Sequence, residues 1–245
     1  MEENIELIKN EFNRIKQLGY VKAVNNNYSG IGLTFEKLLG KEADDFSLPD
    51  FYNIEIKSKL AYSKSPINLF RLTPEGKDFF EIKRIYDTYG CCRKNYGNYK
   101  VFFAKANAHE LRKWYDNYYS LKVDYNEKKL RLLIYDKNIE LIDDYVYWNF
   151  EKLEETLVRK LSYLAIVKAF DTSRNGEKYY KYYNISIYKF KGFDYFLKLL
   201  DEGKITIGFS IDIHKFEKMY GQMHDHGTNF SVDIKYINDI FDLVE

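Results

Sequence analysis

The stretch from Leu48 to Lys59 reads LPDFYNIEIKSK, and its interpretation decides that of the rest of the chain. A proline near its start favours a turn, and the alternating residues after it are typical of a strand. Because successive side chains of a strand point to opposite faces, Ile54 and Ile56 share one face, while Glu55 and Lys57 share the other. The apolar face predicts packing on a core. The charged face places an acid and a base side by side.

Periodic patterns on both sides of this strand predict an α/β or α+β fold. The most distinct helix, at 149–161, has Asn149 as its expected N-cap and a stripe of apolar residues three or four positions apart. The hairpin pattern at 129–148 turns at residues 136–138, and a polar break is expected at 171–178. Further helices are expected at 4–18, 33–40, 193–203 and, weakly, 78–86, and further strands at 163–170, 182–190, 205–214 and 228–234. We expect two lobes, 1–170 with a polar and aromatic insertion at about 64–120, and 171–245.

Composition indicates a globular protein. The chain has 245 residues, 45% of them hydrophobic, which is enough for a sizeable core. Lysine and arginine total 38 against 37 acids, so net charge alone does not point to nucleic acid, although residues 57–113 are locally basic. The 24 tyrosines and 18 phenylalanines are interpreted as large core and groove side chains.

Cysteine usage and the N-terminus predict a cytoplasmic protein. Cys91 and Cys92 are adjacent and make a poor structural bridge, which indicates a reducing compartment. The N-terminal residues form a charged amphipathic helix, which is neither a signal peptide nor a membrane span.

The acid-base strand admits two interpretations. Asp50 and Glu55 offer the hard oxygen ligands that Mg²⁺ prefers, and Lys57 could hold or deprotonate an attacking water. The spacing D-x4-E-x-K therefore matches a site that hydrolyses phosphodiesters. In a chain this charged, the same spacing also arises by chance, and Glu55 with Lys57 would then be a solvent-facing ion pair.

The residues just before the strand bear on this choice. Glu36, near the edge of the short helix, could supply a third carboxylate or be a solvated helix residue. Gly30 and Gly32 in the preceding loop would let the backbone approach a ligand closely.

Three separated motifs resemble one family. NNYSGIGLTFEKLLG at 26–40, PDFYNIEIKSK at 49–59 and HDHGTNF at 224–230 occur in the order found in restriction endonucleases of the MvaI/BcnI type. These are related to the MutH mismatch-repair nickase within the PD-(D/E)XK nuclease superfamily. The resemblance implies a restriction-endonuclease-like mixed sheet flanked by helices, with lobe 1–170 catalytic and lobe 171–245 recognising DNA across a cleft.

The resemblance also implies an activity: a type II restriction endonuclease that depends on Mg²⁺, with Mn²⁺ able to substitute, and cuts double-stranded DNA at a short sequence. It would act as a monomer that nicks each strand in turn, with a DNA methyltransferase as its genetic partner. By similarity, Glu36, Asp50, Glu55 and Lys57 are catalytic. The metal ligands are Asp50, Glu55 and the Ile56 carbonyl.

The HDHG segment carries three alternatives. His224 and His226 lie two residues apart, on one face of an extended stretch, where they could bind zinc if His214 or a loop carboxylate joined them. They could instead pack or cap the loop. The third alternative, which the resemblance also implies, is contact with bases in the major groove, with Asp225 accepting from a cytosine amino group or holding a histidine.

The basic residues divide between phosphates and bases. Lys59, Lys64 and Arg71 are expected to meet backbone phosphates, and Lys168 is a candidate for the scissile phosphate. Family members that read G/C-rich sites tend to carry arginines beside the HDHG loop. In this chain Ser210 and Ser231 stand there, and the nearby cations are His214, Lys215, Lys218 and Lys235.

Two other functions fit the same residues. A MutH-like repair nickase would share the catalytic set, and a catalytically silent module would keep DNA binding alone. A zinc-regulated interaction protein would rest on the two histidines of the HDHG segment.

Overall fold

The strand after the proline turn lies at one edge of a mixed sheet in the computed structural model, which describes residues 1–27, 29–40, 49–76, 80–215 and 218–244. This strand is β2 (Ile54–Leu60), in the order β1-β13-β12-β2, with β18 also pairing with β13. β2 runs parallel to β12, and the other pairs are antiparallel. The other strands are β1 (Val21–Lys22), β12 (Tyr163–Arg174), β13 (Glu177–Phe190) and β18 (Phe241–Leu243). A mixed sheet with helices is the predicted fold class.

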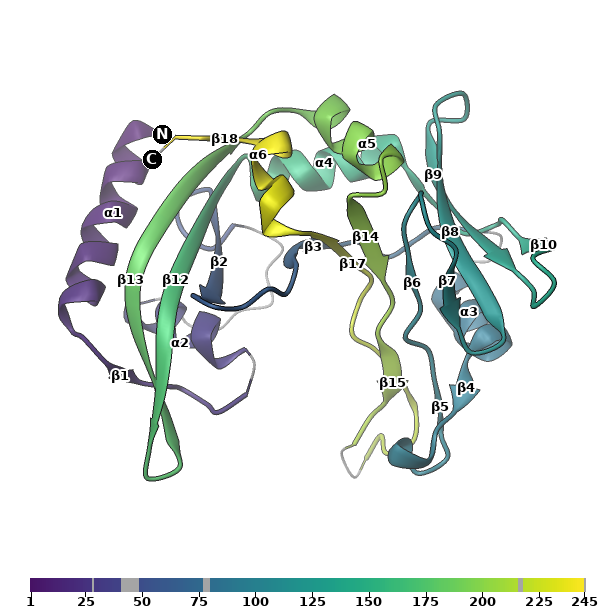
Figure 1. Cartoon of the computed structure of the whole chain (residues 1–245), viewed down its shortest axis with the longest axis horizontal. Coiled ribbons are helices and arrows are strands. Elements are labelled where there is room, and N and C mark those ends of the chain that lie inside the picture. The colour runs from purple at the N-terminus through teal and green to yellow at the C-terminus, as the bar shows by residue number, and fades with distance from the viewer. Residues whose placement is uncertain (28, 41–48, 77–79, 216–217, 245) are drawn as a thin grey trace. The chain divides into compact units, whose positions relative to one another are not determined.

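Two helices pack on the apolar side of this sheet. They are α1 (Glu2–Gln17) and α2 (Gly30–Leu38), and α1 runs alongside β13 in Figure 1. The predicted stripe of α1 is buried together with Ile54 and Ile56 of β2. Fully burying one such side chain contributes about 1.5–3 kcal/mol, so this cluster fixes the face that β2 turns inward.

The predicted polar break at 171–178 is wrong. β12 and β13 pair from Tyr163 with Lys189 to Arg174 with Glu177, with one register shift between Lys168 and Ala169, and reverse at Asn175 and Gly176. Residues 171–174 and 177–178 are thus paired strand residues. Both turn residues have positive φ, 51° and 78°. Asn-Gly suits this kind of two-residue hairpin turn, so the sequence carried the signal inside the polar stretch.

The glycines expected in a ligand-binding loop lie inside α2. Helix α2 begins at Gly30 and not at residue 33, so Gly30 and Gly32 are helical. A Cβ on Gly30 would lie 2.4 Å from the Asn25 carbonyl oxygen. The space beside Gly30 is therefore taken by the chain's own backbone, which corrects the expectation of close approach to a ligand there.

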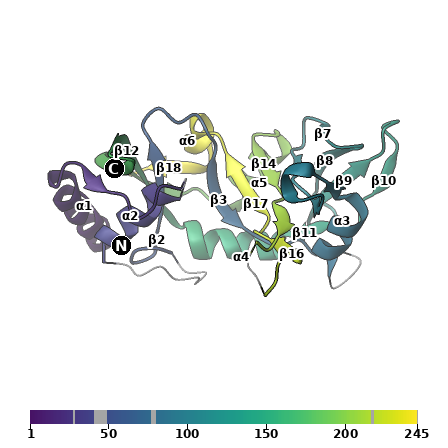
Figure 2. The ribbon, with the colours of Figure 1, turned by 90° about the horizontal axis from the view of Figure 1, so that it is seen from below.

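A second group of elements comes from the middle of the chain. Figure 2 shows β3, β17 and β14 alongside one another, in a sheet of order β3-β17-β14-β6. A further sheet has the order β10-β9-β8-β7 with β11 on β9, and β15-β16 and β4-β5 are two-stranded. The strands are β3 (Ile67–Arg71), β4 (Cys91–Cys92), β5 (Lys100–Val101), β6 (Lys105–Ala106), β7 (Arg112–Trp114), β8 (Asn117–Asp124), β9 (Lys129–Tyr135), β10 (Leu141–Asp143), β11 (Tyr147–Asn149), β14 (Ile205–Gly208), β15 (Ile211–Ile213), β16 (Met223–Asp225) and β17 (Asn229–Val232). The helices are α3 (Glu81–Tyr89), η1 (Lys94–Tyr96), α4 (Phe150–Leu161), α5 (Phe193–Asp201), η2 (Ile234–Tyr236) and α6 (Ile237–Ile240).

Aromatic side chains build the core of this second group. Trp148 packs edge-on against Phe230, and Phe230 stacks on Phe70 with ring centroids 4.5 Å apart. The Trp148 indole also donates a hydrogen bond to the Leu72 carbonyl, at 2.9 Å. The many aromatic residues therefore serve packing here, as their interpretation as core side chains predicted.

The chain divides into two compact units, each made of separate segments. One comprises residues 1–65, 157–191 and 238–245, and the other 66–156 and 192–237. These bounds differ from the contiguous lobes 1–170 and 171–245, because β13 pairs with β12 while residues 66–156 pack with the segment from 192 onward. The predicted insertion at 64–120 thus forms part of the second unit.

Several other predicted elements shift slightly at their ends. The weak helix expected at 78–86 is α3, which begins at Glu81; residue 78 lies outside the described residues. The Asn149 amide donates through Nδ2 to Oε2 of Glu75 at 2.8 Å, and its role as the N-cap of α4 stays a prediction. Cys91 and Cys92 are free thiols. Among the helices that the structure describes, none is long and apolar enough to cross a membrane.

Candidate active site

Strand β2 positions the predicted acid and base as the alternation requires. Ile54 is fully buried and Ile56 is 4% exposed, and both belong to the core under α1 and α2. On the opposite side, Lys57 forms an ion pair and a hydrogen bond with Glu55 through Nζ and Oε1. The pairing of Glu55 and Lys57 on one face is confirmed.

The site is not the exposed ion pair that the chance interpretation describes. Glu55 is only 6% exposed, while the Lys57 side chain is 29% exposed. Burial raises the pKa of the Glu55 carboxyl above its ordinary value, the charge of Lys57 acts against that rise, and the charge of Asp50 adds to it. A buried carboxylate under these influences favours a cation beside it.

Asp50 is held against the same strand. Its Oδ2 accepts a hydrogen bond from the Ile56 amide, at 2.9 Å. This bond fixes the carboxylate beside β2, close enough for its charge to act on Glu55. The structure therefore brings Asp50, Glu55 and Lys57 together, and the carbonyl of Ile56 belongs to the same short stretch.

Glu36 lies on α2, facing the helix's own first turn. Its Oε1 is 3.5 Å from the point where a Cβ on Gly32 would stand, and its charge contributes to the raised pKa of Tyr182. Among the described residues, Glu36, Asp50 and Glu55 do not form a set whose ligand atoms all lie within 4.8 Å of one another. The structure thus groups two of the three predicted carboxylates closely.

Further lysines follow the charged face of β2. Lys59 donates through Nζ to the Ser65 carbonyl, and the parallel register places Lys168 of β12 opposite it. The charge of Lys160, at the end of α4, acts with that of Lys57 against the rise in the pKa of Glu55. The sequence interpretation missed this neighbour. The sequence did contain a sign of this position, because Lys160 directly precedes Leu161 of the helix's apolar stripe, and Leu161 is buried.

The HDHG segment is partly a strand and not a loop. β16 carries His224 and Asp225 and pairs with β15, which sets His224 directly opposite Asp212. The His224 ring lies 4.1 Å from both the His214 and the His226 ring, measured between centroids. The expected shared face of His224 and His226 is confirmed.

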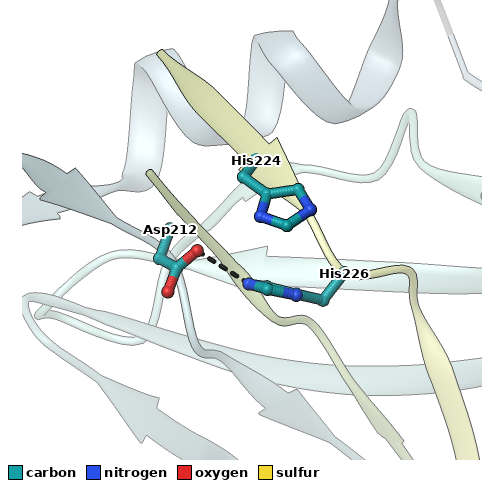
Figure 3. Close-up of side chains that lie close together, drawn as sticks. All are labelled: Asp212, His224 and His226. Carbon is teal, nitrogen blue, oxygen red and sulfur yellow. Dashed lines mark hydrogen bonds and ion pairs between the residues drawn. The ribbon is translucent and has the colours of Figure 1, made fainter. Parts of the chain in front are cut away.

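Asp212 is the residue of this hairpin that the sequence interpretation missed. Its carboxylate and the His226 ring form a hydrogen bond, as Figure 3 shows. Oδ1 of Asp212 and Nε2 of His226 are 2.7 Å apart, and the Asp212 side chain is 9% exposed. Asp225, expected to hold a histidine, instead accepts the Gly227 amide at 2.8 Å and closes the local turn. The signal for Asp212 was the alternation in IDIH, which leaves one acid between two apolar residues.

The surroundings of His224 favour its neutral form, in which one ring nitrogen can accept a hydrogen bond or bind a metal. Burial lowers the pKa of His224, and the nearby imidazoles of His226 and His214 lower it further. Asp212, His224 and His226 form a group of three potential metal ligands within 4.8 Å of one another, in the part of the chain that the structure describes. Lys215 lies 4.0 Å from Asp212, between Nζ and Oδ2, and adds a cation at the edge of this group.

This chain is similar to two solved structures of one restriction endonuclease. The solved structure described as a complex of the restriction endonuclease MvaI with cognate DNA substrate is 28% identical, with a TM-score of 0.92 over 99% of this chain and 98% of that one. The structure of MvaI in the absence of DNA is 27% identical, with a TM-score of 0.64 over 99% and 97%. A search of curated proteins finds no match. The model of the MvaI/BcnI restriction endonuclease family matches residues 9–241, and the chain belongs to that family.

Proposed function

We propose that this protein is a Mg²⁺-dependent type II restriction endonuclease that hydrolyses phosphodiester bonds in double-stranded DNA at a short specific sequence. The observation that carries the proposal is the buried Glu55, paired with Lys57 and flanked by Asp50, in a chain of a restriction endonuclease family. A complex of MvaI with cognate DNA substrate supports DNA as the partner.

The donor set fits a hard divalent cation. Asp50, Glu55 and the Ile56 carbonyl would hold Mg²⁺, and Mn²⁺ would substitute because it accepts the same oxygen ligands. The raised pKa of Glu55, caused first by burial, reflects a negative group with too little compensation, which a bound cation would relieve. When bound, the ion stabilises negative charge on the phosphate and lowers the pKa of a water ligand.

The chain's own residues would do the positioning. Lys57, whose ammonium already lies on the carboxylate of Glu55, would donate a hydrogen bond to the attacking water and orient it toward phosphorus. Lys59 and Lys64 would contact backbone phosphates, which fixes register without reading sequence. Glu36 would be a further carboxylate of the site, reached by rotation of its side chain away from Gly32.

The β15–β16 hairpin would read bases. His224 and His226 would contact base edges in the major groove, Asp225 would hold the turn that presents them, and Lys215 would contact DNA beside them. Asp212 favours this role for His226, because a carboxylate that accepts from Nε2–H fixes the ring's orientation and leaves Nδ1 of the neutral imidazole as an acceptor for a base amino group.

Zinc is the second candidate role for this hairpin, favoured by the grouping of Asp212, His224 and His226. DNA binding measured after exhaustive treatment with a zinc chelator separates the two roles. If the histidines read bases, affinity is unchanged by the chelator and falls in His224→Ala and His226→Ala. Loss of binding on chelation, restored by added zinc, would assign the hairpin to the metal.

Cleavage of plasmid and phage DNA tests the proposal as a whole. Defined fragments are expected with Mg²⁺, none with EDTA, and none from Lys57→Ala. Lys189→Ala is the matched control, since it removes an exposed lysine from β13 of the same sheet. Sequencing the fragment ends reveals the site. Open-circular product alone would favour a MutH-like nickase, and sequence-specific binding without any cleavage would favour a silent DNA-binding module.

A further inference from the structure

Arg71, which was expected to contact a phosphate, lies next to the end of the β15–β16 hairpin. It ends β3 and pairs with Asn229 of β17, just after the HDHG segment. The next residue, Leu72, donates its amide to the Thr228 carbonyl at 3.0 Å. A Cβ on Gly227 would lie 3.0 Å from Cδ of Arg71, so the arginine stem packs closely on the glycine that follows His226.

The Arg71 guanidinium is oriented by a built pair of amides. Its Nε donates to Oδ1 of Asn229 at 2.9 Å, and the same oxygen accepts from Nδ2 of Asn68, also at 2.9 Å. Nη1 and Nη2 donate no hydrogen bond to any residue that the structure describes, and the side chain is exposed. One nitrogen is therefore anchored, while the two that form a fork are available to a ligand.

The surroundings of Arg71 match a base-reading surface. Asn68, Asn229 and Ser231 line one hollow of about 790 Å³, on the polar side of the sheet whose other side carries Phe70 and Phe230. Ser210, the other serine that stands where the family tends to carry an arginine, lines the same hollow. Arg71 does not itself line the hollow, but its Nε is bonded to Asn229, which does.

The place of Arg71 favours a base over a phosphate. A guanidinium fork matches a phosphate as well as the O6 and N7 of guanine, so the fork alone does not choose between them. Arg71 packs on the glycine that directly follows His226, and its Nε is held by Asn229, which places the fork next to the residues proposed to read bases. We propose that Arg71 reads a guanine of the target sequence through Nη1 and Nη2, with Asn229 as its positioning residue; this rests on the proposed function.

Selection of bound duplexes from a random library tests the assignment without cleavage. The background variant is Lys57→Ala in EDTA, so that failure of the nuclease proposal leaves this result readable. The selected site is expected to contain an invariant guanine whose preference falls about 5- to 150-fold in Arg71→Ala. Arg71→Lys, which keeps the charge, should relax the same position while the salt dependence of binding stays unchanged.

Two further variants make the outcome decisive. Asn229→Ala should weaken the preference at the same guanine, because it removes the anchor of Nε, and Arg14→Lys on α1 should leave the selected site unchanged. Lys64→Ala, a phosphate comparator, should weaken binding evenly across sequences. The proposal is overturned if Arg71→Ala behaves as Lys64→Ala does, if Arg71→Lys selects the wild-type site at full preference, or if the background variant selects no sequence.

Discussion

At the scale of single residues, the charge of Glu55 has opposite effects on the stability of the fold and on the proposed activity. Its carboxylate is buried on β2, where burial and the charge of Asp50 raise its pKa while Lys57 acts against the rise. A charge held in this way destabilises the metal-free fold and, in the proposed function, prepares the site for a cation. Stability and activity should therefore respond in opposite directions to the loss of this charge.

The substitution Glu55→Gln tests that opposition. In EDTA at neutral pH, the variant should melt about 2–4 °C higher than the wild type, because it removes a buried charge that Lys57 compensates only in part. It should also lose cleavage, together with the stabilisation that Mg²⁺ gives the wild type. Thermal melts with and without Mg²⁺ measure both effects, and Glu155→Gln on the exposed side of α4 is the control.

The pH dependence of the same variant follows from the direction of the shift. A pKa raised by folding means that the folded protein binds the proton more tightly than the unfolded chain. Stability is then lost as pH rises through the window between the ordinary carboxyl value of 4.5 and the raised one. The advantage of Glu55→Gln should be largest at neutral pH and should vanish as pH falls toward 4.5. An advantage that grows in acid would contradict this account.

At the scale of elements, what could be predicted depended on periodicity. The alternation in β2 and the stripes of α1 and α4 are local patterns, and the structure confirms all three. Contacts that join distant strands leave no local pattern. Asp212 reaches His226 and Arg71 reaches Asn229 only through the strand pairs β15–β16 and β3–β17, so neither partnership was visible in the sequence.

Helix α3 is tied to strand β10 by an ion network of the same non-local kind. Arg84 donates hydrogen bonds to Glu81 and to Asp143, and its Nη1 lies 2.6 Å from Oδ2 of Asp143. The side chains of both acids are only 2% exposed. Tyr89 donates to the same Asp143 oxygen at 2.7 Å. Burial acts to raise the pKa of Asp143, but the hydrogen bonds from Arg84, the Tyr145 amide and Tyr89 outweigh burial. The pKa of Asp143 therefore lies below its ordinary value.

Arg84→Ala should destabilise the fold by about 3–5 kcal/mol at neutral pH, because two buried carboxylates lose their partner. The lowered pKa of Asp143 gives stability that is present above the ordinary carboxyl value and is lost as pH falls through the lowered one. The defect should therefore shrink in acid. Urea unfolding at several pH values measures it, with Lys83→Ala as the control on the same helix, since its ion pair with Asp87 is exposed. If Arg84→Ala and Lys83→Ala lower the free energy of unfolding equally, the buried ion network does not stabilise the fold more than an exposed ion pair does.

At the scale of the whole molecule, the unit boundaries lay beyond sequence patterns. Each compact unit is assembled from segments that are separate in the chain, 1–65 with 157–191 and 238–245 in one unit and 66–156 with 192–237 in the other. No composition change marks residues 65 and 157, because the core of each unit mixes aliphatic and aromatic side chains, such as Ile54 and Phe35 in one and Leu69 and Trp148 in the other. The near-neutral net charge was likewise uninformative, and family membership was carried by three short motifs spread over the chain.

A single catalytic set in one chain predicts how plasmid DNA is cut. If the protein acts as a monomer, the set of Asp50, Glu55 and Lys57 cleaves one strand per engagement, so supercoiled plasmid with one site should pass through open-circular DNA before linear DNA appears. The fraction of open-circular intermediate should not depend on enzyme concentration when enzyme is in excess. The eluted mass should correspond to one chain of 29.4 kDa for the free protein and to one such chain plus one duplex for the complex with a site-bearing duplex. Direct conversion to linear DNA, at a rate that rises with the square of enzyme concentration, would instead require two chains, each supplying one site to one strand.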